Sequence, residues 1–277
     1  MIPTKPLGRD GATIPALGLG VFRMASEDTV RMVRTALQLG YRHIDTAQIY
    51  GNEAEVGRGL AESGVPRDEV FVTTKVWVDH YRGADFRQSV QDSLARLRTD
   101  YVDLLLLHWP SGKVPLAEQI AALNEAHAGG RARHIGVSNF TTALMREAAA
   151  LSAAPLVNNQ VEYHPYLDQS AVRAEAQRLG MSITAYYGMA DGKVLQDPVI
   201  GAIAQRLGKT PAQVALRWLV QQDNVIALSK TLRAERAADN ARIFDFELDA
   251  ADMRALADLA RPDGRLVSPD GLAPQWD

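Results

Sequence analysis

Cysteine is absent from this chain of 277 residues. Its absence excludes a disulfide framework, a thiolate nucleophile and any metal site built on sulfur ligands. No apolar run reaches the roughly 18 residues that a membrane-spanning helix needs. The first residues, Met1 to Pro6, also lack the apolar core of a secretory signal. We therefore expect a cytoplasmic protein, which is consistent with the missing cysteines.

The chain has no excess of one charge sign, because 30 basic residues face 33 acidic ones and the formal net charge is -3. This balance predicts neither a nucleic-acid partner nor a membrane partner, although a local basic pocket could still exist. A hydrophobic content of 47% can form the core of one large α/β domain or of two smaller ones. Since no proline-rich or low-complexity linker divides the chain, we predict one domain over residues 1–277.

Short apolar runs alternate along the chain with longer amphipathic stretches. The runs predict eight strands, at Ala16–Gly20, Arg42–Asp45, Val70–Val76, Val102–His108, Ala132–Ser138, Leu156–Gln160, Ser182–Ala185 and Val225–Leu228. The amphipathic stretches predict helices at Asp28–Leu39, Glu53–Ser63, Phe86–Leu97, Ala117–Ala128, Met145–Leu151, Ala171–Leu179, Val199–Leu207 and Pro211–Gln222.

The spacing of the strand ends points to a closed barrel. Asp45, Lys75, His108 and Ser138 mark successive strand ends, and they lie roughly 30 residues apart, the length of one βα unit. Eight such units in about 250 residues fit a (β/α)₈ TIM barrel better than an open doubly wound sheet. The turn signal Asp10–Gly11 predicts an N-terminal β-hairpin over the barrel bottom, and we expect additional C-terminal helices.

Ionisable side chains stand at the ends of three consecutive predicted strands: Asp45, Lys75 and His108. Tyr50 follows Asp45 on the loop that leaves the second strand. The carboxyl ends of parallel strands share one mouth of a barrel, where catalytic groups gather. We therefore expect these four side chains to meet there.

The four residue types suit the reduction of a carbonyl group. A phenol has a pKa near 10, so Tyr50 donates a proton at neutral pH only if a cation such as Lys75 favours its anion. Asp45 can hold that ammonium and keep it protonated, while His108 hydrogen-bonds the oxygen of a bound carbonyl. The set contains no serine or cysteine nucleophile and no ligand cluster for a hydrolytic metal, so we predict no metal site.

Five motifs, in order and spread over the whole chain, make the sequence resemble the aldo-keto reductases. They are Gly40–Ala47 with Tyr50, Thr74–Lys75, Leu107–Pro110, Ile135–Phe140 and Asn159–Pro165. The C-terminal stretch Arg265–Pro274, followed by Trp276–Asp277, is similar to a bacterial branch of this family, the 2,5-diketo-D-gluconate reductases B that also reduce methylglyoxal.

The resemblance implies a TIM barrel that binds NADPH/NADP⁺ without a Gly-x-Gly-x-x-Gly turn, which Gly18–Phe22 does not complete. It implies an oxidoreductase acting on CH–OH donors, with Tyr50, Asp45, Lys75 and His108 as the catalytic tetrad. The implied cofactor-binding residues are Gly20, Val21, Phe22, Asp45, Ser138, Asn139, Gln160, Tyr186, Lys230, Thr231, Arg233, Arg236 and Asn240. Among these, Ser138, Asn139 and Gln160 would hold the carboxamide, Tyr186 would stack on the nicotinamide, and the basic residues after Ser229 would meet the 2′-phosphate.

The implied substrate is a small-molecule carbonyl compound. The residues implied to line its pocket are Phe22, Trp77, His108, Trp109, Met189 and Trp276. The chain departs from the family pattern at Ser229, where proline is usual, and at Asp239, where a glutamate or glutamine is usual. The loop Tyr187–Asp191 also departs, which puts the pyrophosphate contacts in doubt.

Other interpretations compete with this one. Asp45 and Lys75 could form a structural ion pair, which would leave Tyr50 unexplained, and Trp77 and Trp109 could be core packing. Arg233 and Arg236 stand at a predicted helix start, where the helix dipole disfavours them unless an anion binds. As a whole, the chain is interpreted as a carbonyl reductase. The alternative is a nicotinamide-binding regulatory module similar to the potassium-channel β-subunits. A metal-dependent hydrolase is a more distant third interpretation. We expect a monomer.

Overall fold

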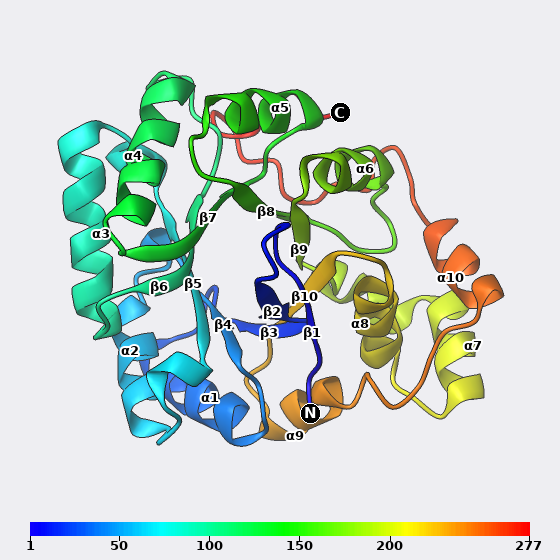
Figure 1. The fold of residues 1–277 in the computed structure, drawn as a ribbon. Helices are drawn as coiled ribbons and strands as arrows, with labels where there is room; N and C mark the ends of the chain where they lie inside the picture. The colour runs from blue at the N-terminus through cyan, green and yellow to red at the C-terminus, as the bar shows by residue number, and fades with distance from the viewer.

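A computed structural model describes all 277 residues, and its centre is a closed barrel of eight parallel strands (Figure 1). The strands follow one another around the barrel in the order β10-β3-β4-β5-β6-β7-β8-β9. Their bounds are β3 (Leu17–Gly20), β4 (His43–Asp45), β5 (Phe71–Val76), β6 (Val102–Leu107), β7 (Ala132–Ser138), β8 (Leu156–Glu162), β9 (Ser182–Tyr186) and β10 (Val225–Ser229). All eight predicted strands are confirmed, as is the TIM-barrel architecture.

Helices surround the barrel on its outside (Figure 1). They are α1 (Ser26–Gln38), α2 (Glu53–Glu62), α3 (Gly83–Leu97), α4 (Leu116–Ala128), α5 (Thr142–Leu151), α6 (Ser170–Leu179), α7 (Pro198–Leu207), α8 (Pro211–Gln221), α9 (Ala234–Ala241) and α10 (Ala250–Ala257). Short 3₁₀ turns lie at Gln48–Tyr50, Arg67–Glu69, Val78–His80 and Ala190–Gln196. The additional C-terminal helices are confirmed as α9 and α10.

Two predicted helix starts are wrong. The helix predicted from Phe86 begins at Gly83, and the one predicted from Met145 begins at Thr142. Each predicted start is the first residue of its helix that is buried. In α5 the true start is set by a polar contact instead, because the Thr141 hydroxyl accepts a hydrogen bond from the Leu144 amide.

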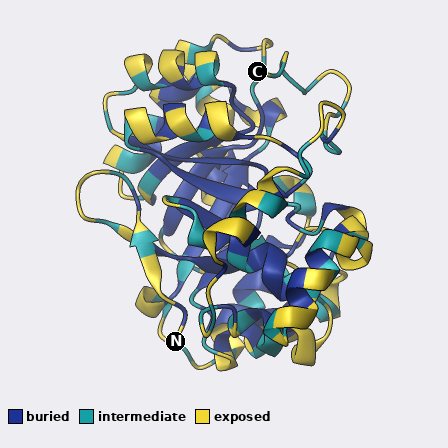
Figure 2. Ribbon diagram, turned by 90° about the vertical axis from the view of Figure 1, so that its right-hand side faces the viewer, coloured by how far each residue is buried: buried dark blue, intermediate teal, exposed yellow.

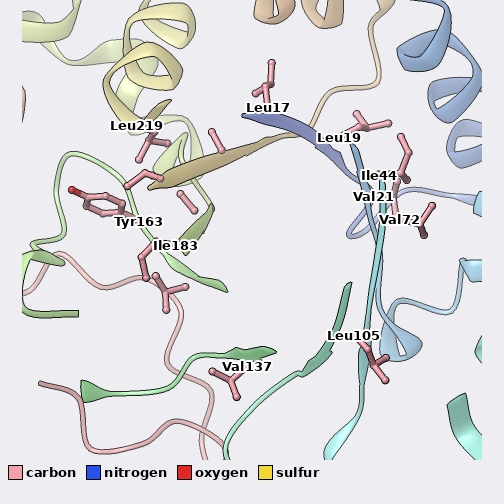
Figure 3. Close-up of a cluster of buried hydrophobic side chains, with 14 of the residues drawn as sticks. Leu17, Leu19, Val21, Ile44, Val72, Leu105, Val137, Tyr163, Ile183 and Leu219 are labelled. Atoms are coloured by element: carbon pink, nitrogen blue, oxygen red, sulfur yellow. The ribbon is translucent and has the colours of Figure 1, made fainter. Parts of the chain in front are cut away.

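The alternation of side chains along the strands separates an apolar outer layer from a more polar interior. Side chains such as Ile44, Val72 and Leu105 lie on the outer side of the ring of strands, facing the helices (Figure 3). They belong to a single cluster of 62 buried hydrophobic residues. The strands therefore form the most deeply buried part of the molecule, and the outer faces of the helices are exposed (Figure 2).

An antiparallel hairpin closes the barrel at the amino-terminal ends of the strands, as predicted. Its strands are β1 (Thr4–Pro6) and β2 (Thr13–Pro15). Leu7 and Ile14 are fully buried and pack against Leu104, Leu106, Val157 and Ile226. This separate cluster of six residues plugs the closed end, so the opposite end is left as the barrel mouth.

The last part of the chain, after α10, has no helix or strand and runs to a point beside α5 (Figure 1). There the Asp277 carboxylate accepts hydrogen bonds from the amide and the hydroxyl of Thr142, at 2.9 and 2.7 Å. This segment therefore returns to the barrel mouth from a distant part of the sequence.

Candidate active site

Lys75 joins the side chains that the sequence placed at neighbouring strand ends. Its Nζ atom donates to Asp45 Oδ1 at 2.6 Å, to the Thr46 carbonyl at 2.8 Å and to the Tyr50 hydroxyl at 3.3 Å. Asp45 and Lys75 both point into the barrel because β4 and β5 are parallel and side chains alternate along each. The turn Gln48–Tyr50 then brings the phenol back over the ammonium.

The electrostatics of this group follow from its burial. Burial alone would lower the pKa of Lys75, but attraction to Asp45 and Tyr50 outweighs it and raises the pKa above its usual value. Burial raises the pKa of the Tyr50 phenol, and the opposing pull of Lys75 is smaller. The phenol is therefore protonated at neutral pH. Lys75 favours the phenolate, as expected, but its effect on the pKa of Tyr50 is smaller than that of burial.

His108 stands beside Tyr50 at the end of β6. The two rings are 5.6 Å apart between centroids and nearly perpendicular, at 76°. Burial, with Lys75 adding to it, lowers the pKa of His108 well below the usual value, so the imidazole is neutral. Its Nδ1 atom has no hydrogen-bond partner. A neutral imidazole can donate one hydrogen bond to a ligand oxygen and carries no net charge.

A cavity of about 750 Å³ opens in front of these residues. The predicted residues that line it are Gly20, Phe22, Asp45, Tyr50, Trp77, His108, Trp109, Ser138, Asn139, Gln160, Tyr186, Met189 and Lys230. Phe22 lies 4.8 Å from Tyr50 between ring centroids, and Trp77 lies 5.3 Å from His108. The structure thus brings together most of the predicted catalytic, cofactor and substrate residues.

Seven predicted site residues do not line this cavity: Val21, Lys75, Thr231, Arg233, Arg236, Asn240 and Trp276. Lys75 is completely buried beneath the phenol, and Val21 is core. The Trp276 ring packs against Trp109, 6.2 Å away, and so supports the wall from behind. Thr231 to Asn240 follow β10 in the loop before α9 and in α9 itself, beyond Lys230.

A chain of hydrogen bonds connects the predicted carboxamide residues to the ion pair. Gln160 Nε2 donates to Asp45 Oδ2 at 2.7 Å, and the Ser138 hydroxyl donates to the Gln160 carbonyl at 2.8 Å. The Tyr186 hydroxyl donates to Asn139 Oδ1 at 2.7 Å. These contacts fix the side chains on strands β4, β7, β8 and β9 relative to one another, so this floor of the cavity is rigid.

The loop after β9 has an unusual backbone where the sequence departs from the family pattern. Tyr187, Ala190 and Asp191 all have left-handed backbone conformations, with φ between 46° and 63°. The Tyr187 hydroxyl donates to Asp191 Oδ1 at 2.5 Å. Such conformations are costly for residues other than glycine and persist where surrounding contacts hold them.

The sequence prediction missed several residues of the cavity. Arg23 lines it with a left-handed backbone, φ 56°, and its guanidinium lies 4.8 Å from the Phe22 ring centroid. The cavity is also lined by residues of the C-terminal segment that has no helix or strand: Leu266, Val267, Ser268, Pro269 and Leu272. For the second group, the signals available were the apolar residues in a stretch without helix or strand periodicity and the resemblance of Arg265–Pro274 to one branch of the family.

No group of three or more His, Asp or Glu side chains is arranged to hold a metal ion. No helix is both long enough and apolar enough to cross a membrane.

Comparison with known proteins places this geometry in a family. Residues 16–261 match the model of the aldo/keto reductase family. The methylglyoxal reductase DkgB of Escherichia coli O157:H7 is 48% identical over 267 residues, which cover 95% of this chain and 99% of that protein. A crystal structure provisionally described as 2,5-diketo-D-gluconic acid reductase B has a TM-score of 0.98 and 59% identity, covering 100% of this chain and 98% of the other. A mutant of Gox0644 solved with NADPH has a TM-score of 0.90 and 35% identity, covering 97% of each chain. The chain belongs to the aldo/keto reductase family.

Proposed function

We propose that this protein is an NADPH-dependent carbonyl reductase that converts small aldehydes, dicarbonyls similar to methylglyoxal, or keto-sugar acids similar to 2,5-diketo-gluconate into alcohols. The observation that carries the proposal is the Lys75 ammonium, held between the Asp45 carboxylate and the Tyr50 phenol beneath an open cavity. Family membership and the names of the relatives support the same chemistry.

The residues present fit a nicotinamide cofactor. Ser138, Asn139 and Gln160 offer hydroxyl and amide groups side by side along one edge of the cavity, and these groups can pair with a carboxamide. The Tyr186 ring lines the cavity on the next strand, where it would stack on the nicotinamide. Lys230 and Arg23 place two cations on the cavity wall, where phosphate groups would meet them. When bound, NADPH would supply the hydride for the carbonyl carbon.

The departures from the family pattern leave these basic contacts possible. Ser229 is buried at the end of β10, and its hydroxyl lies 3.4 Å from that of Tyr41. Ser229 therefore contributes to the barrel wall, and it lines the cavity next to Lys230. Beyond the cavity, the chain continues through Thr231, Arg233, Arg236 and Asn240. By family resemblance, the basic residues among them would meet the 2′-phosphate and Asn240 would lie near the adenine.

Tyr50 is the proposed proton donor. Its phenol is protonated in the free protein and lies within hydrogen-bonding distance of the Lys75 ammonium. As negative charge develops on the substrate oxygen, Tyr50 gives up its proton and Lys75 stabilises the resulting phenolate. Neutral His108 orients the carbonyl oxygen by donating a hydrogen bond. Asp45 keeps the ammonium in place and charged.

Reductase assays with a panel of carbonyl compounds test this function. Methylglyoxal, 2,5-diketo-gluconate, simple aldehydes and β-keto esters are supplied with NADPH or NADH, and the loss of reduced-nicotinamide absorbance is followed. We expect turnover of at least one class, faster with NADPH. Flat traces together with tight NADPH binding would instead favour the regulatory module.

A further inference from the structure

A second buried carboxylate, outside the tetrad, lies at the end of β8. Glu162 has no exposed surface. Its two oxygens accept hydrogen bonds from the backbone amides of Leu266 at 2.8 Å and Val267 at 2.9 Å. His164 Nε2 lies 2.9 Å from one oxygen, and the Arg265 guanidinium lies 3.9 Å from the other. Donors from the loop after β8 and from the C-terminal segment therefore share one carboxylate.

The segment held by Glu162 is the substrate wall. We call residues 265–277 the C-terminal strap. Leu266, Val267 and Leu272 of the strap line the cavity, facing the space in front of Tyr50 and His108. The strap contains no helix or strand. Its internal backbone bonds join Leu272 and Ala273 to the Pro269 carbonyl, so they define a local turn and leave its position on the barrel to other contacts.

The strap has a second, weaker anchor at its other end. At an exposed position, the Asp277 carboxylate accepts from the Thr142 amide. Inside the strap, Trp276 donates to the Ser268 hydroxyl at 3.1 Å, also exposed. The Arg265 guanidinium lies 3.6 Å from the centroid of the Trp276 ring. Water competes for exposed contacts of this kind, whereas charge-assisted bonds to a buried carboxylate are stronger. Glu162 is therefore the main polar attachment of the strap, whose Leu266, Val267 and Leu272 also pack against the buried core.

We infer that Glu162 is a positioning residue that sets the substrate wall: by holding Leu266 and Val267 it fixes how far the strap lies from Tyr50 and His108, and so which carbonyl substituents fit. This inference rests on the proposed reductase function. Glu162 does not line the cavity, so its substitution is expected to act on the wall and to leave the tetrad and the cofactor edge in place.

Glu162→Gln tests the inference, because an amide preserves the shape of the side chain but lacks the charge and one acceptor oxygen. Glu53→Gln is the matched control. Glu53 is equally buried and accepts from Thr74 and Arg96, but it lies on α2 and has no contact with the strap.

We expect Glu162→Gln to raise the KM for phenylglyoxal about tenfold, the equivalent of one charge-assisted hydrogen bond. The KM for the smaller methylglyoxal should rise less, because its methyl group reaches the wall less than a phenyl ring does. The kcat values and the Kd of NADPH should stay within about twofold, and Glu53→Gln should leave the ratio of the two KM values unchanged. An unchanged ratio in Glu162→Gln, or an equal change in both variants, would overturn the inference.

Limited trypsin digestion gives a readout that does not depend on turnover. Arg261 precedes a proline, so cleavage after Arg265 is the informative event, and it releases the peptide 266–277. This release should be about tenfold faster in Glu162→Gln than in the wild type and in Glu53→Gln. Equal release would contradict the anchor. If the wild type reduced no carbonyl, the proposed function would fail, and the digestion would still show whether Glu162 holds the strap.

Discussion

The two ends of the barrel contain the same types of side chain in different arrangements. At the mouth, Asp45 pairs with Lys75 beside Tyr50; at the closed end, Asp103 pairs with Arg67 and Arg133 beside Tyr101. Each end thus has a buried aspartate, basic side chains and a tyrosine. The difference lies in what surrounds the tyrosine at each end.

At the closed end the carboxylate and the tyrosine ring are occupied. The two Asp103 oxygens accept from Arg67 at 2.9 Å, Arg133 at 3.2 Å and the Val72 amide at 2.9 Å. The Tyr101 ring lies between the two guanidinium groups, at 4.3 and 4.0 Å from its centroid. Such an arrangement holds strands together and leaves no acid or base facing a cavity.

At the mouth, by contrast, Tyr50 and His108 face an open cavity while Lys75 and Asp45 support them from beneath. The comparison indicates that a reactive site needs side chains with free hydrogen-bonding capacity next to side chains whose hydrogen bonds are already made. This accords with the general assignment of catalysis to the carboxyl ends of barrel strands and of stability to the other end.

The largest expected effect is at the mouth. Tyr50→Phe removes the only proposed proton donor, so kcat/KM for carbonyl reduction should fall about a thousandfold, within the range of general acid catalysis. NADPH affinity and the free energy of unfolding should change little, because the ring remains. Steady-state kinetics and a urea titration measure both, and retained turnover would contradict the role of Tyr50.

The closed end should show the reverse. Asp103→Asn leaves two guanidinium groups without their anion and should lower the free energy of unfolding by about 2 kcal/mol. This is less than the loss typical of a fully buried pair, because the Arg133 side chain is 48% exposed and therefore screened by solvent. In the folded protein kcat/KM should remain as in the wild type. A loss of activity without a loss of stability would remove the distinction between the two ends.

His43 lies inside the barrel, two residues before Asp45. The pH dependence of the free energy of unfolding tests whether His43 contributes to stability, as the groups of the closed end do. Burial, and to a lesser degree Lys75, lowers the pKa of His43 from 6.5 to about 3. Because the folded pKa lies below the unfolded one, this stabilisation is complete above pH 6.5 and is lost as the pH falls toward 3. Between pH 6 and 4 the wild type should therefore lose about 1.4 kcal/mol more per pH unit than His43→Gln. Parallel urea midpoints at each pH would show that His43 does not carry this dependence.

The smallest effect is expected at the cofactor edge. Arg236 is exposed in the first turn of α9. Arg236→Ala should raise the KM for NADPH by about tenfold and leave that for NADH within twofold, since only NADPH carries the 2′-phosphate. Arg242→Ala, near the other end of the same helix, is the control and should affect neither. Equal changes for both cofactors would place Arg236 away from the phosphate.

Much of the fold could be predicted because its signals are local. The apolar runs and their spacing of roughly 30 residues indicated eight βα units, and the strand ends at Asp45, Lys75 and His108 indicated the mouth. The starts of α3 and α5 were missed because the residues before Phe86 and Met145 in these helices are not buried, so they do not belong to the apolar face that the periodicity marks. Arg23 was missed because its place on the cavity wall depends on a left-handed backbone that no sequence pattern announced.

The substrate wall could not be predicted from local sequence patterns. Leu266 and Val267 reach the cavity through Glu162, more than 100 positions earlier in the chain, and Asp277 meets Thr142 over a separation of 135 residues. Periodicity carries no information about such contacts, because they form only when the barrel closes and brings β8 under the strap.

The order of residues along the chain was therefore enough to specify the barrel, the direction of its strands and the residue types that gather at its mouth, since parallel strands with a period of two send their ends to one side. Chain closure and burial set the rest: the seating of Lys75 between Asp45 and Tyr50, the protonated phenol, the neutral imidazole and the wall formed by the strap. The physical reason is that desolvation and long-range contacts depend on which groups enclose a side chain in space, whichever residues are its neighbours in the sequence.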